Sequence, residues 1–116
     1  MKLSLVVAMV DDDKTEAVIE AARASGATGA TIIKSVRGEG LQPGRTFFGL
    51  RFGVARDVLL FLVTEPRARE ILERIRDAGQ MESEEGAGIA VQLAIEDAVG
   101  LNSQMTALLA ELEAAL

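Results

Sequence analysis

The sequence contains no cysteine and no histidine among its 116 residues. Disulfide bonds, thiolate nucleophiles, Ser-His and Cys-His dyads and zinc sites are therefore excluded. A magnesium or calcium ion held by carboxylates stays possible. Tyrosine and tryptophan are missing too, and the aromatic residues are four phenylalanines. The core must therefore be aliphatic and rich in alanine.

Basic residues are also scarce. The chain has 12 Lys and Arg against 18 Asp and Glu, which gives a formal net charge of −6. A general nucleic-acid binder needs a basic face that displaces counterions, so we expect no nucleic-acid partner. No apolar run approaches the length of a membrane span, and the first one, residues 3–10, is too short for a signal peptide. These features predict a cytoplasmic protein with one domain over residues 1–116.

Hydrophobic periodicity predicts four strands and three helices. The strands are expected at residues 3–10, 30–36, 58–64 and 89–95. The helices are expected at residues 14–24, from Glu65-Pro66 to residues 77–79, and at about 102–115 with Asn102 as a cap. This order fits an α+β fold of the ferredoxin-like βαββαβ type, with a long loop between strands two and three and an extra C-terminal helix.

Three consecutive aspartates, residues 11–13, precede the first predicted helix. They could hold a cation, but we favour the interpretation that they cap the helix and complement its dipole. Gly26 is expected to end the same helix in left-handed geometry.

The third predicted strand is apolar on both faces, because every residue from 58 to 63 is hydrophobic. A single layer of helices covers only one face of a sheet. An identical neighbouring subunit is the simplest cover for the other face, so we expect the protein to oligomerise through it.

The segment 37–56 lies between two predicted strands and holds five of the eleven glycines and three of the four phenylalanines. A connection of this length is usually functional or disordered, and aromatic residues argue against disorder. We favour a functional arm over a structural β-ribbon extension. Aromatic and arginine side chains dominate interface energetics. Our predicted partner contacts are therefore Arg45, Phe47, Phe48, Arg51 and Phe52.

Two Gly-x-Gly turns, 38–40 and 86–88, flank the predicted central strands. Such turns let backbone amides approach a phosphate, although most are simply turns. Three glutamates, Glu82, Glu84 and Glu85, precede the second turn and would repel an anion. We interpret them as a solvated loop and find no catalytic constellation. We therefore predict a binding protein, and regard a small enzyme or metal-binding protein as the weaker alternative.

The segment 36–46 resembles the start of the T-loop of the PII nitrogen-regulatory signal-transduction proteins. Residues 26–31 are similar to that family's approach to strand two, and residues 86–88 are similar to its B-loop. Order and length agree over roughly residues 1–101. The resemblance implies a homotrimer with nucleotide clefts between subunits and an arm that engages a target protein, such as the cytoplasmic face of a transporter.

The resemblance also implies an effector site. Gln42 matches the glutamine that takes part in binding Mg-ATP and 2-oxoglutarate in that family. ATP, ADP or AMP is the expected effector, and no cofactor is required. The expected effector-binding residues are Lys34, Arg37, Gly38, Gly40, Gln42, Gly86 and Gly88.

Several departures from the family pattern bear on this site. Basic residues of the family are replaced by Leu41, Ile89, Gly100 and Asn102, which removes charge-assisted hydrogen bonds to phosphate. The modifiable tyrosine is absent, and Thr46 is the sole hydroxyl in residues 37–56. We therefore expect a divergent PII-like protein with weak or altered nucleotide binding. The alternative is an interaction trimer without ligand control.

Overall fold

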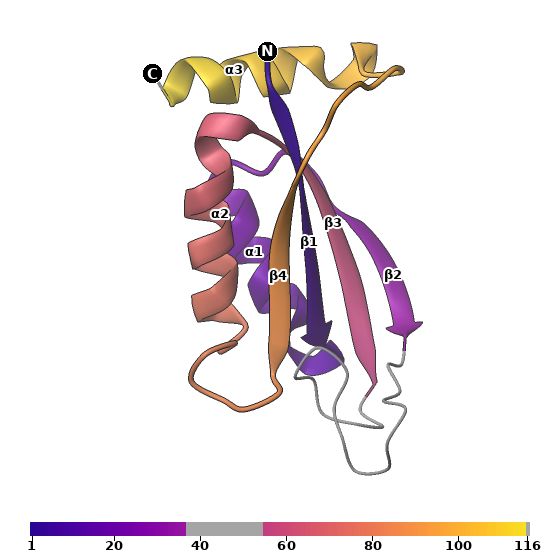
Figure 1. The fold of residues 1–116 in the computed structure, drawn as a ribbon, viewed down its shortest axis with the longest axis vertical. Helices are drawn as coiled ribbons and strands as arrows, with labels where there is room; N and C mark the ends of the chain where they lie inside the picture. The colour runs from indigo at the N-terminus through magenta and orange to yellow at the C-terminus, as the bar shows by residue number, and fades with distance from the viewer. Residues whose placement is uncertain (37–54, 116) are drawn as a thin grey trace.

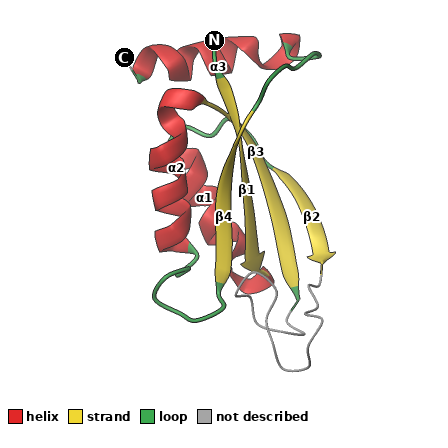
Figure 2. Ribbon diagram, viewed as in Figure 1, coloured by secondary structure: helices red, strands yellow, loops and turns green. Residues whose placement is uncertain are grey.

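The computed structural model describes residues 1–36 and 55–115. Four strands form one antiparallel sheet in the order β2-β3-β1-β4. In chain order they are β1 (Leu3–Asp11), β2 (Thr31–Val36), β3 (Arg56–Thr64) and β4 (Gly88–Ala94). The helices are α1 (Thr15–Ala24), α2 (Glu65–Ala78) and α3 (Met105–Ala114), and short 3-10 turns, η1 (Asp12–Lys14) and η2 (Asn102–Gln104), precede α1 and α3. This topology is the predicted ferredoxin-like arrangement (Figures 1 and 2).

The core lies between the sheet and the helices α1 and α2, which contact each other. Side chains of β1 alternate along the strand, with one set buried and the other half-buried. Both helices turn an apolar stripe toward the buried set, as their spacing predicts. The core residues include Val6, Ala8, Val10, Val18, Ile19, Ala22, Leu59, Phe61, Val63, Ala68, Ile71 and Ile75. Burial of these aliphatic side chains and one phenylalanine is the main source of stability.

No helix of the described residues lies on the opposite face of the sheet. Residue pairing places apolar side chains of the four strands together on this face. Ile33, Val91 and Leu93 are exposed there, whereas the neighbours on β1 and β3 are half-buried. We call this set the open face; it comprises Leu5, Val7, Met9, Ile33, Val58, Leu60, Leu62, Ile89, Val91 and Leu93. Its position agrees with the sequence prediction of a second apolar sheet surface.

Helix α3 lies across the end of the sheet that also carries Met1 (Figure 1). Leu108 is buried against the domain, and Arg67 of α2 pairs with Glu111 at 3.5 Å. The buried side of α3 is narrow, because the neighbouring Leu109 is exposed. The reason is that α3 meets the end of the sheet and not one of its faces. No helix in the described part of the chain is long and apolar enough to cross a membrane.

The start of α1 corrects one prediction. The helix begins at Thr15 after η1, and no side chain caps either element. Asp11 is the last residue of β1, and its carboxylate binds Arg56. Asp12 and Asp13 still lie in the first turn, where negative charge complements the helix dipole. Likewise, Asn102 makes no side-chain cap, and η2 precedes α3. Gly26, with φ +112°, does follow α1 in left-handed geometry.

Candidate functional site

Two loops meet the same end of the sheet. Strand β2 ends at Val36 and β3 begins at Arg56, so both flank the segment 37–54. The connection from α2 to β4, residues 79–87, reaches the sheet at this end too (Figure 1). We call this the loop end of the sheet, because α3 and Met1 lie at the other end. It therefore holds the base of the predicted arm and the predicted B-loop.

Arg56 is the central residue of the loop end. It pairs with Asp11 in the β1–β3 register, and its Nη1 donates to the Asp11 Oδ1 at 2.7 Å. Its Nη2 donates to the backbone carbonyl of Gly86 at 3.2 Å. Arg56 is only 2% exposed and Asp11 only 5%. A buried guanidinium needs such compensation, and its planar fork can serve two acceptors at once. Arg56 thus joins β3, β1 and the predicted B-loop.

Asp57 is a second buried charge, on the helix-covered side of the sheet, since side chains alternate along β3. Its Oδ2 accepts a hydrogen bond from the Thr15 hydroxyl at 2.6 Å. The same oxygen accepts one from the Lys34 Nζ at 3.2 Å. These contacts fasten the start of α1 and the last part of β2 to the beginning of β3. Both sides of the segment 37–54 are therefore held by ionic contacts.

Lys14 connects the start of α1 to the predicted B-loop. Its Nζ lies 2.6 Å from the Glu84 Oε2. The Lys14 side chain is 13% exposed and that of Glu84 is 43% exposed. Glu84 is thus partly solvated, as expected for the acidic loop, but it is also an ion-pair partner. Within the described residues, no three acidic side chains gather closely enough to hold a metal ion.

The two glycines of the predicted B-loop have local structural roles. Gly86 has φ +73°, a conformation that other residues adopt at a cost. Gly88 pairs with Val10 in the β1–β4 ladder. A Cβ atom on Gly88 would lie 2.6 Å from the backbone oxygen of Met9, which is closer than real Cβ contacts come. Gly88 is therefore required for β4 to approach β1, whether or not a ligand binds.

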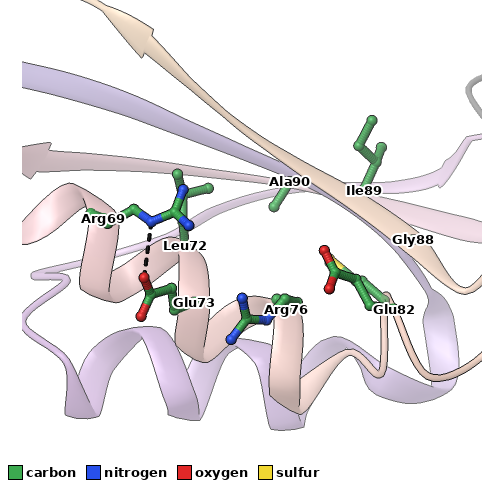
Figure 3. A pocket seen from close by; sticks show the side chains of 9 residues that line it. Arg69, Leu72, Glu73, Arg76, Glu82, Gly88, Ile89 and Ala90 are labelled. Carbon is green, nitrogen blue, oxygen red and sulfur yellow. Dashed lines mark hydrogen bonds and ion pairs between the residues drawn. The ribbon is translucent and has the colours of Figure 1, made fainter.

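A cavity of about 270 Å³ lies beside Gly88, between α2 and β4 (Figure 3). Figure 3 shows Ala90 of β4 facing the helix and the ion pair of Arg69 with Glu73, at 2.9 Å. Arg76 pairs with Asp77 at 3.0 Å, and this hydrogen bond raises the pKa of the Arg76 guanidinium. Both arginines are thus already neutralised by carboxylates of the same helix.

The structure brings two predicted effector residues to the loop end, Lys34 and Gly86. Gly88 lies there as well, as a packing residue of the β1–β4 ladder. The remaining predicted site residues lie outside the described residues: Arg37, Gly38, Gly40, Gln42, Arg45, Phe47, Phe48, Arg51 and Phe52.

Sequence reasoning missed the ion pairs and hydrogen bonds of the loop end. The charged residues are Asp11, Lys14, Arg56 and Asp57, Thr15 donates a hydrogen bond, and the pairing of Glu84 was missed with them. The one local signal was the position of charged residues directly at the ends of apolar strands. Asp11 follows one such strand, and Arg56-Asp57 precede another.

The family model of the nitrogen regulatory protein P-II matches residues 3–104. The chain belongs to the P-II family. P-II proteins are signal-transduction regulators that form trimers and bind effectors and target proteins. The match covers all four strands and the first two helices, and it ends just before α3. No curated protein sequence matches the chain.

Two solved structures have a similar fold. A putative PII-like signaling protein from Thermus thermophilus is 25% identical, with a TM-score of 0.61, and the match covers 82% of this chain and 88% of that one. The CPII protein from Thiomonas intermedia, solved with ADP, AMP and acetate, is 17% identical, with a TM-score of 0.60. That second match covers 83% of this chain and 90% of CPII and shows the shared fold.

Proposed function

We propose that this P-II protein is a nucleotide-responsive regulator whose effector binds at the loop end. An adenine nucleotide there would bias the arrangement of residues 37–54, which then engage or release a target protein. The observation that carries the proposal is the pair of hydrogen bonds that Arg56 donates, to Asp11 and to the Gly86 carbonyl. This one side chain joins the predicted B-loop to the strand that follows the arm.

The coupling would act through the Gly86 carbonyl. A phosphate bound by the backbone amides near residues 86–88 would reorient that loop and alter the acceptor of the Arg56 Nη2. Arg56 begins β3, so a shift of its guanidinium reaches the base of the arm directly. A ligand can bias an equilibrium only by its differential affinity for two states. The hydrogen bond from Arg56 to the Gly86 carbonyl would be made in one state and altered in the other, so it would give the ligand different affinities for the two states.

The charges at the loop end support a weakly held anion. Lys14, Lys34 and Arg56 are cations there, but each contacts a carboxylate. The family's basic residues are replaced by neutral ones, and Ile89, one such position, lies in β4 on the open face. Phosphate would therefore gain fewer charge-assisted hydrogen bonds than in a typical member. The ADP and AMP named with CPII make an adenine nucleotide the first candidate effector.

The direct test is a calorimetric titration of ATP, ADP and AMP, with and without Mg²⁺. Lys34→Gln removes one loop-end cation and should weaken binding about tenfold, the worth of one charge-assisted hydrogen bond. Lys2→Gln is the matched control, since it makes the same charge change at the opposite end of the sheet. Equal affinities of the two variants, or no binding by any protein, would contradict the proposed site. The second result would favour the ligand-independent interaction trimer.

We further propose that three copies associate through the open face, as P-II proteins form trimers. Leu93 is 50% exposed on that face in the single chain. Contact between such an apolar surface and water is unfavourable. Leu93→Asp should convert the trimer to monomer in multi-angle light scattering. Val99→Asp is the control, because Val99 is 93% exposed outside the sheet. A trimer that survives Leu93→Asp would place the interface elsewhere.

A further inference from the structure

We infer that the cavity between α2 and β4 binds a small zwitterion, namely a free α-amino acid with an aliphatic side chain. The site goes beyond the proposed function, because it lies on the helix-covered side of β4 and needs no nucleotide. Arg76 would hold the carboxylate of the ligand and Glu82 its ammonium group. Leu72 and Met81 would contact its side chain.

The cavity is small and has an apolar base. Its volume of about 270 Å³ lies just below the roughly 300–1,000 Å³ of pockets for drug-sized ligands, so it suits a small metabolite. Leu72, Met81 and Ala90 line it, and all three are partly buried against the core. Met81 also packs closely on Gly88, since a Cβ atom added there would lie 3.3 Å from the Met81 Cε. An aliphatic side chain that enters the cavity would exchange water for these apolar contacts.

The rim of the cavity carries both signs of charge. Arg69 and Arg76 lie on one face of α2, because they are about two helical turns apart. After α2 the chain turns back, and the Met81 amide donates to the Arg76 carbonyl at 3.0 Å. This turn places Glu82 at the cavity, and Figure 3 shows its carboxylate pointing from the loop toward the cavity. The pKa of the Arg76 guanidinium is raised by its hydrogen bond to Asp77 and further by the charge of Glu82.

Arg76 and Glu82 both keep atoms that a ligand can bind. The Arg76 Nε donates to Asp77 at 3.0 Å, and within residues 1–36 and 55–115 the guanidinium has no other acceptor. In the same ranges Glu82 has neither a hydrogen bond nor an ion pair. The terminal nitrogens of Arg76 can therefore bind a carboxylate, and Glu82 can bind an ammonium group. The Arg76 side chain is 37% exposed against 77% for Arg69, which makes Arg76 the less solvated of the two cations.

The distribution of charge favours a ligand that carries both signs. Arg69 and Arg76 are paired with carboxylates of their own helix, Glu73 and Asp77. A bare anion would meet these carboxylates and Glu82 as well, and a bare cation would meet both arginines. A zwitterion presents each of its charges to an opposite one and adds no net charge.

The experiment titrates the intact protein with L-leucine in calorimetry and in amide NMR spectra. Binding should shift the amide signals of Met81, Gly88 and Ala90, which line the cavity. Arg76→Gln should weaken leucine binding at least tenfold, by the loss of a charge-assisted hydrogen bond. Arg74→Gln is the matched control, with the same charge change at an exposed position of the same helix outside the cavity. It should change the affinity less than about threefold, because exposed charges are screened.

Two further pairs of variants test the other parts of the site. Glu82→Gln should weaken leucine binding about tenfold, whereas Glu85→Gln, in the same loop but outside the cavity, should leave it nearly unchanged. Ala90→Leu fills the cavity without a change of charge and should abolish binding. Ala94→Leu is its control, because Ala94 is an exposed residue of the same strand outside this cavity. Circular dichroism checks that each variant is folded.

Analogues of leucine test the class of ligand. Isocaproate lacks the ammonium group and isoamylamine lacks the carboxylate, so each should bind at least tenfold more weakly than leucine. Glycine keeps both charges but has no side chain to bury, and it should bind more weakly too. N-acetyl-leucine represents the C-terminus of a peptide, whose amine is neutralised, and should also lose affinity.

Four results would overturn the inference. These are no leucine binding at millimolar concentration, equal leucine affinities for Arg76→Gln and Arg74→Gln, isocaproate binding as tight as that of leucine, and N-acetyl-leucine binding as tight as that of leucine. The third result would identify a simple carboxylate site, and the fourth a site for a peptide C-terminus. Each result stands whether or not the protein binds ADP, because leucine and the nucleotide are titrated separately.

Discussion

Replacing Arg56 by methionine should lower the free energy of unfolding by about 3–5 kcal/mol, the cost of breaking a buried ion pair from one side. Methionine keeps much of the aliphatic volume, so the loss is mainly electrostatic. The substitution removes the guanidinium nitrogen that lies 2.7 Å from the Asp11 carboxylate, and Asp11 is only 5% exposed. It also takes the donor at 3.2 Å from the Gly86 carbonyl. A domain of this size is stable by about 5–15 kcal/mol, so much of that margin would be lost.

Urea unfolding followed by circular dichroism measures this loss, at one fixed protein concentration because self-association adds to apparent stability. A thermal scan should show a melting point lower by roughly 12–20 °C. The control is the double variant Arg56→Met/Asp11→Asn, which removes both charges. It should be less destabilised than the sum of the two single variants, because neither residue then keeps a buried charge that has lost the other. A loss below about 1 kcal/mol for Arg56→Met, or strict additivity, would refute the reasoning.

The remaining predictions concern packing and backbone conformation, and equilibrium unfolding measures each of them. Gly88→Ala should destabilise the protein by about 2–3 kcal/mol, which is the usual cost of overpacking a core. The added Cβ would lie only 2.6 Å from the Met9 carbonyl oxygen. Gly29→Ala, with nothing within 4 Å of its added Cβ, should be close to neutral, and an equal loss at both positions would contradict the packing argument. Gln80→Gly should stabilise by about 0.5–1 kcal/mol, since Gln80 has φ +53°, and a loss would mean that its side chain has another role. Phe61→Ala should cost about 3–5 kcal/mol because it removes a buried aromatic side chain, and a cost below about 1 kcal/mol would place Phe61 outside the core.

The fold was predictable because periodicity is a local property of the sequence. Helix α2 was predicted with its Pro66 start and its end near Ala78, and the structure confirms both. Strand β3 was predicted to begin at residue 58 but begins at Arg56. The apolar pattern begins only at Val58, because Arg56 and Asp57 are charged and resemble loop residues. Their burial depends on partners 23 to 45 positions away in the sequence, which no local pattern reveals.

The same limit explains the error at residues 11–13. Local rules favour aspartate as a helix cap, and Asp12 and Asp13 do lie in the first turn. Asp11, in contrast, neutralises a guanidinium 45 residues later in the chain. Tertiary pairing overrides the local preference there. Two residues named from the sequence, Gly86 and Lys34, lie at the loop end, but the ion pairs beside them involve residues far apart in the chain, which the fold alone brings together.

The close approach at Gly88 changes how glycine motifs should be used to infer ligand binding across P-II sequences. Selection for folding alone would retain glycine at this position, because any side chain would separate two paired strands. The glycine would therefore persist in a descendant that had ceased to bind nucleotides. Loss of the basic residues would then precede loss of the glycine by a long evolutionary interval. An ancestral reconstruction that scores ligand binding should weigh the cations of the loop end and disregard Gly88.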